Sequence, residues 1–123
     1  MTTRVFVYGS LLRGEPNHPV IARGVLVGAA STVPCYQLHD LGAFPGMIAD
    51  GAHAVAGEVY EVDRATLAEL DRLEGHPRFY RRTPIALADG TLAETYLLTR
   101  AQVEGRPVVP TGNWRAHRKE KFR

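Results

Sequence analysis

Apolar residues in this chain occur in short runs separated by glycine, proline and polar residues, a pattern typical of a small β-sheet. The first run, residues 5–8, reads Val-Phe-Val-Tyr and stops at Gly9 and Ser10, which predicts a strand with a sharp exit. Residues 11–18 have the composition of a loop, and the apolar pair 20–21 is compatible with one helical turn. The chain therefore begins with a predicted strand and a long loop.

Further strands are predicted in the middle of the chain. Residues 24–41 alternate small, β-branched and polar side chains around Pro34, which indicates one long bent strand or two short strands at a sheet edge. Residues 47–49 predict a short strand that ends at Asp-Gly, and residues 53–62 alternate well enough to predict another strand.

One segment has the periodicity of a helix. Asp63 is a favourable N-cap and Gly75 a favourable C-cap, and leucines recur between them at three-residue spacing. We therefore expect one main helix between these two residues.

The last part of the chain predicts a hairpin and an irregular segment. The runs 79–87 and 92–98 flank Asp-Gly at positions 89–90, a strong hairpin signal. Residues 107–114 are broken by proline and glycine, and we expect them to pack over the sheet without regular structure. Many short strands with one main helix indicate an α+β domain or a partly closed antiparallel barrel.

Size and composition narrow the class of protein. A chain of 123 residues with 45% hydrophobic and 23% charged residues is expected to form one globular domain. Its single cysteine excludes an internal disulfide and a four-cysteine zinc site. No apolar run approaches the ~20 residues that a membrane helix needs, and no signal peptide is visible, so we expect a cytoplasmic protein with no membrane partner.

The formal net charge of +2 conceals a basic C-terminus. Five of the fifteen basic residues lie in the last nine positions, opposed there only by Glu120. We expect residues 1–114 to form the single domain and residues 115–123 to be a solvated basic tail. Nucleic-acid binding by the tail is the weaker alternative, because only Phe122 is interleaved with these charges.

Glu74 breaks two local rules of the predicted helix. It follows Leu67 and Leu70 by seven and four positions, on the apolar stripe, and lies in the last turn, where the helix dipole disfavours negative charge. A carboxylate at the edge of an apolar interior has a raised pKa and accepts protons at neutral pH, so Glu74 is a candidate general base. The alternative is a carboxylate that turns to solvent or pairs with an arginine. Three arginines follow closely: Arg78, Arg81 and Arg82.

The second candidate site is the strand exit Tyr8-Gly9-Ser10-Leu11. Glycine lets the backbone turn tightly, and the N–H groups of such a turn can hold a carboxylate or an oxyanion. The segment has neither the Lys-Ser/Thr of a phosphate-binding P-loop nor the Gly-x-Ser-x-Gly of a hydrolase elbow. The simple alternative is a structural turn.

Metal and cofactor sites are not predicted. The five histidines are scattered along the chain without helical i, i+4 spacing, at His18, His39, His53, His76 and His117. Cys35 follows Pro34 in an apolar stretch and is expected to be a core or edge residue.

Two segments together resemble a known family. Residues 5–18 read Val-Phe-Val-Tyr-Gly-Ser-Leu-Leu-Arg-Gly-Glu-Pro-Asn-His, and residues 70–77 read Leu-Asp-Arg-Leu-Glu-Gly-His-Pro. On these motifs the chain resembles the γ-glutamylcyclotransferase-like family, and within it the γ-glutamylamine cyclotransferase (AIG2-like) branch. Tyr80 followed by Arg82, and Gly-Asn-Trp at residues 112–114, extend the resemblance over most of the chain.

The resemblance implies a fold and a set of roles. The fold would be α+β, a small mixed, partly closed β-barrel with one main α-helix. Glu74 would be the catalytic base and acid, and the substrate-binding residues would be Tyr8, Gly9, Ser10, Leu11 and Tyr80. Near the pocket mouth, Tyr80 and Trp114 are candidates for an aromatic wall, and the alternative is that they are core or lid aromatics.

The family's reaction implies a partner as well. In that reaction the α-amino group of a γ-glutamyl compound attacks its own γ-carbonyl, which releases 5-oxoproline and an amine without a cofactor. We therefore expect a small-molecule γ-glutamyl substrate and a monomer or weak homodimer. The alternative is a non-catalytic module that binds a small metabolite or a protein on the same fold.

The chain departs from the branch's motif at three positions. Ser10 keeps the hydroxyl of the usual threonine, so the loop is expected to keep its function. Leu12 and Asn113 stand where lysine and aspartate are usual, which leaves the identity of the γ-glutamyl compound open.

Overall fold

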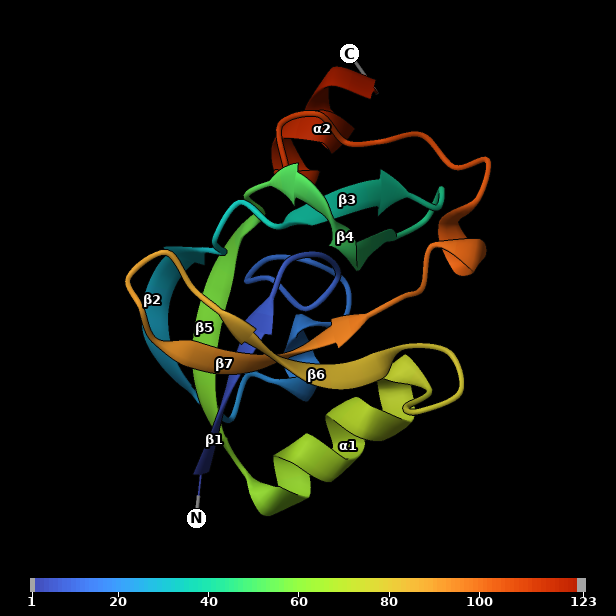
Figure 1. Ribbon diagram of the computed structural model, residues 1–123. Helices are drawn as coiled ribbons and strands as arrows, with labels where there is room; N and C mark the ends of the chain where they lie inside the picture. Colours follow the sequence, from blue (N-terminus) through green and yellow to red (C-terminus); the bar gives the residue numbers. More distant parts are fainter. Residues whose placement is uncertain (1, 122–123) are drawn as a thin grey trace.

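The computed structural model describes residues 2–121 and has one seven-stranded sheet with two helices (Figure 1). The helices are α1 (Arg64–Glu74) and α2 (Trp114–Lys121), with short 3-10 turns at His18–Val20 and Ala101–Val103. The strands are β1 (Thr2–Val7), β2 (Val25–Ser31), β3 (Tyr36–Asp40), β4 (Pro45–His53), β5 (Ala56–Asp63), β6 (Arg81–Ala86) and β7 (Leu92–Leu97). Within residues 2–121, no helix is long and apolar enough to cross a membrane.

The sheet is mixed and open. Its strands are hydrogen-bonded in the order β2-β5-β1-β7-β4-β3, and β6 pairs with β7 beside that path. β1 is antiparallel to β5 and parallel to β7. The outer strands β2 and β3 do not pair with each other along this path, so the sheet does not close. The expected α+β class is confirmed.

β1 lies in the middle of the sheet because both of its faces are apolar. Val5 and Val7 belong to one cluster of buried residues, together with Leu70 of α1. Phe6 and Tyr8 point to the opposite face and belong to the second cluster. A strand buried on both faces has a continuous apolar run, as the sequence has here.

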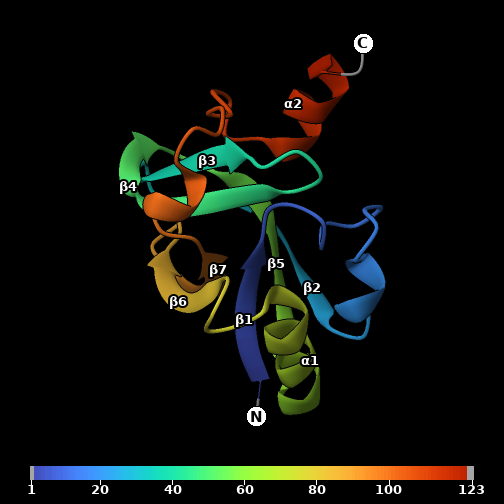
Figure 2. The same ribbon diagram turned by 90° about the vertical axis from the view of Figure 1, so that its right-hand side faces the viewer.

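α1 begins and ends where the sequence predicts. The Asp63 Oδ1 atom accepts a hydrogen bond from the Thr66 N–H at 2.7 Å, and Gly75 ends the helix in the left-handed conformation with φ of 69°. Leu70 is fully buried, whereas Leu73 is 42% exposed. Figure 2 shows α1 packed beside β1 and β5, with α2 at the opposite end of the molecule.

The boundaries of the middle strands differ from those that the sequence predicts. Residues 24–41 contain two strands, β2 and β3, which is one of the two alternatives that the sequence left open. β4 continues through residues 50–51, where a strand end was predicted, and includes His53. A register shift between β3 and β4 beside Tyr36 accommodates these extra residues. The hairpin predicted around residues 89–90 is confirmed by β6 and β7.

α2 stands in place of the solvated tail that the basic C-terminus led us to expect. Trp114, its first residue, is 2% exposed and belongs to the second core cluster. The Asn113 Oδ1 atom accepts a hydrogen bond from the Ala116 N–H at 3.0 Å, which caps the helix. The tail prediction is therefore wrong for residues 115–121, and residues 122–123 lie outside the described part of the chain.

Charge partners that are distant in sequence explain this difference. The His117 Nε2 atom lies 2.9 Å from Oδ2 of Asp40. Arg115 and Arg118 both contact the carboxylate of Glu15. Because these acidic groups come from the first third of the chain, the local sequence gives no sign that the basic residues are paired.

We predict that Trp114→Ala lowers the free energy of unfolding by about 3–5 kcal/mol, because it removes a fully buried indole and leaves a cavity. Urea unfolding of the two proteins measures this change. The control is Lys119→Ala, an exposed position of the same helix, which is expected to change the free energy by no more than about 0.5 kcal/mol. A small effect of Trp114→Ala would mean that α2 is not packed on the core.

Candidate active site

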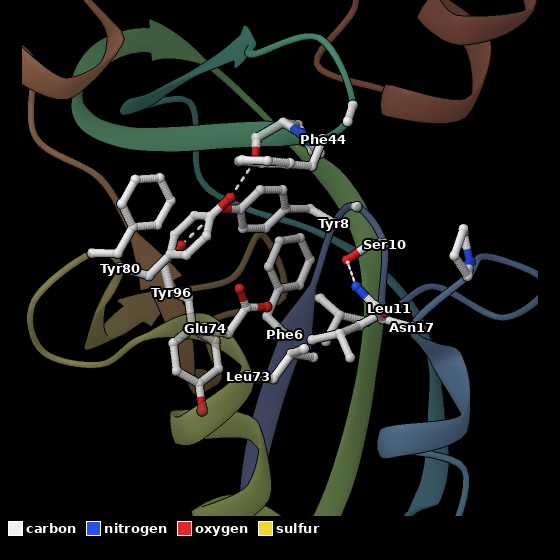
Figure 3. Close-up of a pocket in the computed structure, with 16 residues that line it drawn as sticks. Phe6, Tyr8, Ser10, Leu11, Asn17, Phe44, Leu73, Glu74, Tyr80 and Tyr96 are labelled. Carbon is white, nitrogen blue, oxygen red and sulfur yellow. Dashed lines mark hydrogen bonds between the residues drawn. The ribbon is translucent and has the colours of Figure 1, made fainter.

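A cavity of about 460 Å³ lies at the end of β1. Its walls come from the loop after β1, the loop before β4, the end of α1 with the loop that follows, and β7 (Figure 3). Six of its lining residues are those that the sequence analysis selected: Tyr8, Gly9, Ser10, Leu11, Glu74 and Tyr80. The fold therefore brings together two segments that lie more than sixty residues apart.

Glu74 is the last residue of α1, and its carboxylate points into the cavity (Figure 3). The chain reverses directly after it at Gly75, and the Tyr80 N–H donates a hydrogen bond to the Glu74 carbonyl oxygen at 3.2 Å. This reversal fixes the Tyr80 side chain beside the Glu74 carboxylate in the same cavity.

The Glu74 carboxyl group is partly buried among apolar side chains. Desolvation raises its pKa from an ordinary value near 4.5 to about 7. Within residues 2–121 no hydrogen bond or ion pair reaches this carboxylate. A carboxyl group in this state can both accept and release a proton near neutral pH.

Arg82, one of the three arginines named as possible partners of Glu74, is paired elsewhere. The Arg82 Nε atom lies 3.0 Å from Oδ1 of Asp71, and its Nη1 atom lies 3.2 Å from Oε1 of Glu94. The Tyr96 hydroxyl also donates to Oδ1 of Asp71, at 2.7 Å. Asp71 and Glu94 therefore hold the guanidinium group away from the cavity. The alternative in which Glu74 pairs with Arg78, Arg81 or Arg82 is wrong within residues 2–121.

The loop after β1 turns tightly against the start of β4. A Cβ atom on Gly9 would lie 2.5 Å from Cγ of Pro45, so the close approach of Pro45 requires glycine here, although Gly9 does not have a positive φ. The Leu12 N–H donates to the Gly9 carbonyl oxygen at 3.1 Å and closes the turn.

The loop leaves polar groups available at the cavity wall. The Asn17 Nδ2 atom donates to Oγ of Ser10 at 3.0 Å, which leaves the Ser10 hydroxyl proton free to donate. Within the described residues, the backbone N–H groups of Ser10 and Leu11 have no protein acceptor. These three donors are suited to hold a carboxylate or an oxyanion.

The three cavity tyrosines have their hydroxyl groups engaged by the protein. The Tyr8 hydroxyl donates to the Tyr96 carbonyl oxygen at 2.6 Å and accepts from the Met47 N–H at 3.2 Å. The Tyr80 hydroxyl donates to the Pro45 carbonyl oxygen at 2.7 Å. Burial raises the pKa of Tyr8, Tyr80 and Tyr96, so all three stay protonated at neutral pH. Their rings contribute shape and apolar surface.

The sequence analysis missed several residues of the cavity. Phe44 was not selected as a site residue, yet its ring lies 6.2 Å from that of Phe79, whose ring lies 5.0 Å from that of Tyr80. Of the two aromatic residues suggested for the wall, Tyr80 lines the cavity and Trp114 does not; Trp114 packs in the core against His117. Sequence alone had no signal for Phe44 and Phe79, because an apolar residue in a loop looks the same whether it lines a cavity or covers the core.

Among the described residues that line the cavity, Glu74 has the one charged side chain. Within the described part of the chain, none of the lining residues is an arginine, lysine or histidine. Nor do three histidine, cysteine or acidic side chains come together there in an arrangement that could hold a metal ion. A ligand with a single carboxylate can be held by the loop donors, whereas a second carboxylate would meet no cation in the cavity wall.

Sequence and fold are similar to those of a known protein family. Residues 5–116 match the family model described as gamma-glutamyl cyclotransferase, AIG2-like. A Vibrio cholerae protein named putative gamma-glutamylcyclotransferase is 51% identical over 87 residues, which are 71% of this chain and 75% of that protein. Rat gamma-glutamylaminecyclotransferase is 40% identical over 91 residues, 66% of this chain and 60% of the rat protein. The crystal structure of a mouse AIG2-like protein superimposes with a TM-score of 0.73 at 31% identity, over 78% of this chain and 76% of the mouse chain.

We predict that Glu74 makes the stability of the chain fall as pH rises from about 4.5 to about 7. In this window the folded chain keeps the proton that the unfolded chain releases. The contribution of protonated Glu74 to the free energy of unfolding is therefore complete below about pH 4.5 and lost above about pH 7. Glu74→Gln removes the charge, and it is expected to stabilise the chain at about pH 8 by up to about 3 kcal/mol relative to the unchanged protein, and little at about pH 4.

Urea unfolding of both proteins at the two pH values measures this difference. Glu69→Gln, which changes an exposed glutamate of the same helix, is the control and should give the same small difference at both. A Glu74→Gln effect that does not change with pH would show that the Glu74 carboxylate is well solvated.

Proposed function

The chain belongs to the AIG2-like gamma-glutamyl cyclotransferase family, and we propose that it cyclises a γ-glutamyl amine to 5-oxoproline and a free amine, with Glu74 as general base and acid. The observation that carries the proposal is the state of Glu74. Its carboxylate faces a cavity next to the strand-exit loop, without an ionic partner in residues 2–121 and with a pKa of about 7.

The proposed reaction needs one proton carrier. The α-amino nitrogen of the substrate forms a bond to the γ-carbonyl carbon, and the bond from that carbon to the leaving nitrogen breaks. Glu74 takes a proton from the attacking nitrogen and returns it to the leaving nitrogen, so the carboxylate is regenerated. A group with a pKa near neutrality suits both halves of this transfer.

The loop after β1 is proposed to hold the glutamyl end of the substrate. The Ser10 and Leu11 N–H groups and the Ser10 hydroxyl would bind the α-carboxylate, which directs the α-amine toward Glu74. The buried faces of Tyr8 and Tyr80 would confine the glutamyl chain in its folded form. Because ring closure is intramolecular, this confinement supplies much of the rate.

The leaving amine is proposed to lie at the aromatic side of the cavity. Phe44, Phe79 and Leu73 line this part, and Phe79 and Leu73 are 43% and 42% exposed. The described lining residues include no arginine, lysine or histidine, so nothing in the wall would neutralise a carboxylate on the leaving group. An amine with an apolar body therefore suits the cavity better than an amino acid does.

We predict that Glu74→Gln lowers kcat by at least about 10²-fold, since the amide keeps the shape of the side chain but cannot accept the proton. The substrate is expected to bind the variant with little change in Kd, measured by calorimetry. In the unchanged protein, kcat/KM should fall below about pH 7 as Glu74 becomes protonated. Glu69→Gln serves as the control, and near-normal turnover by Glu74→Gln would rule out the base role.

We also predict an order of substrates in an assay for released 5-oxoproline. γ-Glutamyl benzylamine should react with a higher kcat/KM than γ-glutamylglycine or glutathione, which carry a carboxylate on the leaving side. N-Acetyl-γ-glutamyl benzylamine lacks the nucleophilic amine and should not react.

Two results would contradict the proposed chemistry. Release of benzylamine from the N-acetyl compound at the rate of its parent would mean amide hydrolysis instead of cyclisation. Binding of these compounds without any 5-oxoproline would indicate a non-catalytic binding module.

A further inference from the structure

Two carboxylates hold the loop after β1 from outside the cavity. Glu15 lies in this loop, and its side chain is only 7% exposed. The Arg118 guanidinium of α2 donates to both of its oxygens, through Nη1 to Oε1 and through Nη2 to Oε2 at 3.4 Å, and the Arg115 Nε atom lies 3.5 Å from Oε2. Glu58 of β5 accepts a hydrogen bond from the Arg13 N–H at 2.9 Å. The loop is therefore tied to α2 and β5 by ionic and hydrogen-bonded contacts.

The loop itself is a chain of turns that links Glu15 to Ser10. The Glu15 N–H donates to the Leu12 carbonyl oxygen at 2.9 Å. Two residues further on, the Asn17 N–H donates to the Ser10 carbonyl oxygen at 2.9 Å, and the Asn17 Nδ2 atom donates to Oγ of Ser10 at 3.0 Å. Asn17, two residues after Glu15, is thus hydrogen-bonded twice to Ser10 at the cavity.

α2 is the better anchored of the two elements. Its Trp114 is buried in the core and stacks on His117 at 5.9 Å between ring centroids, and His117 contacts Asp40 at 2.9 Å. In residues 13–18 of the loop, Arg13, Gly14 and Pro16 are exposed, Asn17 and His18 are half-buried, and Glu15 is the buried residue. Within residues 13–18, Glu15 is therefore the side chain that ties the loop to α2.

We propose that α2 braces the substrate loop, and that Glu15, Arg115 and Arg118 are positioning residues that hold Ser10 and Asn17 in the conformation that binds substrate. None of the three lines the cavity. A buried carboxylate is tolerated because it is paired, so loss of its arginines drives Glu15 toward water and takes the loop with it. The identity of the ligand that the loop binds rests on the proposed function, whereas the ordering of the loop by α2 is independent of it.

A kinetic comparison tests the brace. Arg118→Gln and Glu15→Gln are each expected to lower kcat/KM for γ-glutamyl benzylamine by about tenfold or more, since a misplacement of ~1 Å can cost about 10²-fold. Most of the loss should appear as a higher KM, because the loop acts in binding. Arg118→Lys should recover part of it. Lys119→Gln, which removes a charge from the same helix outside the Glu15 ion pair, is the matched control and should leave KM unchanged.

The double variant Glu15→Gln/Arg118→Gln separates a shared role from two separate ones. If the two side chains act as one brace, kcat/KM of the double variant should be no lower than that of the less active single variant. Losses that multiply in the double variant would overturn the proposal. Where Arg118→Gln fails to fold, Glu15→Gln against Lys119→Gln carries the same test, because it removes the buried charge itself.

A second readout needs no substrate. Amide hydrogen exchange at the hydrogen-bonded N–H groups of Leu12, Glu15 and Asn17 is expected to speed up about tenfold or more in Arg118→Gln and not in Lys119→Gln, because exchange reports the opening of the loop. If the unchanged chain turns over no γ-glutamyl compound, the proposed function fails and exchange alone decides on the brace. Unchanged exchange in Arg118→Gln and Glu15→Gln would overturn it.

Discussion

The two-sided burial of β1 is the constraint on which the rest of the structure depends. A strand whose successive side chains enter two different core clusters has to lie inside the sheet. The loop that follows β1 therefore starts among packed elements. Gly9 makes this exit possible, because any larger residue would collide with Pro45 at the start of β4. The cavity lies at this exit and takes its walls from the elements that meet there.

The cavity combines an apolar wall with one carboxylate, which is an unfavourable arrangement for stability. The chain keeps Glu74 unneutralised by committing Arg82 to Asp71 and Glu94 just outside the cavity. Tyr96 adds a hydrogen bond to Asp71, which links β7 to the last turn of α1. A helix that ends with a desolvated carboxylate breaks the local rules of helix design, and such breaks are expected where a protein gives up stability for chemistry.

The candidate site draws on both ends of the chain. Its loop belongs to the first twenty residues, yet the buried Glu15 of that loop is paired with arginines from α2, about one hundred residues later. α2 owes its own position to Trp114, which packs into the cluster that also holds Phe6 of β1 and Tyr8, the residue after β1. The C-terminal helix is thus joined to the cavity by an apolar contact behind β1 and by an ionic contact at the loop.

The sequence by itself determined the elements whose signals are local. The run at residues 5–8, the caps Asp63 and Gly75, the Asp-Gly hairpin and the apolar phase of Glu74 all depend on neighbours within a few residues, and the sequence predicted each of them correctly. The segments 5–18 and 70–77 carried the family resemblance, which the comparisons confirm.

The tertiary structure decided what depends on distant partners. Only the fold shows that Arg82 is taken by Asp71 and Glu94, that Phe44 and Phe79 wall the cavity while Trp114 does not, and that basic residues of the supposed tail form a helix paired with Glu15. In each case the position of a side chain is set by groups that are remote along the chain. No local pattern of charge or hydrophobicity predicts those contacts, because they form only when the chain has folded.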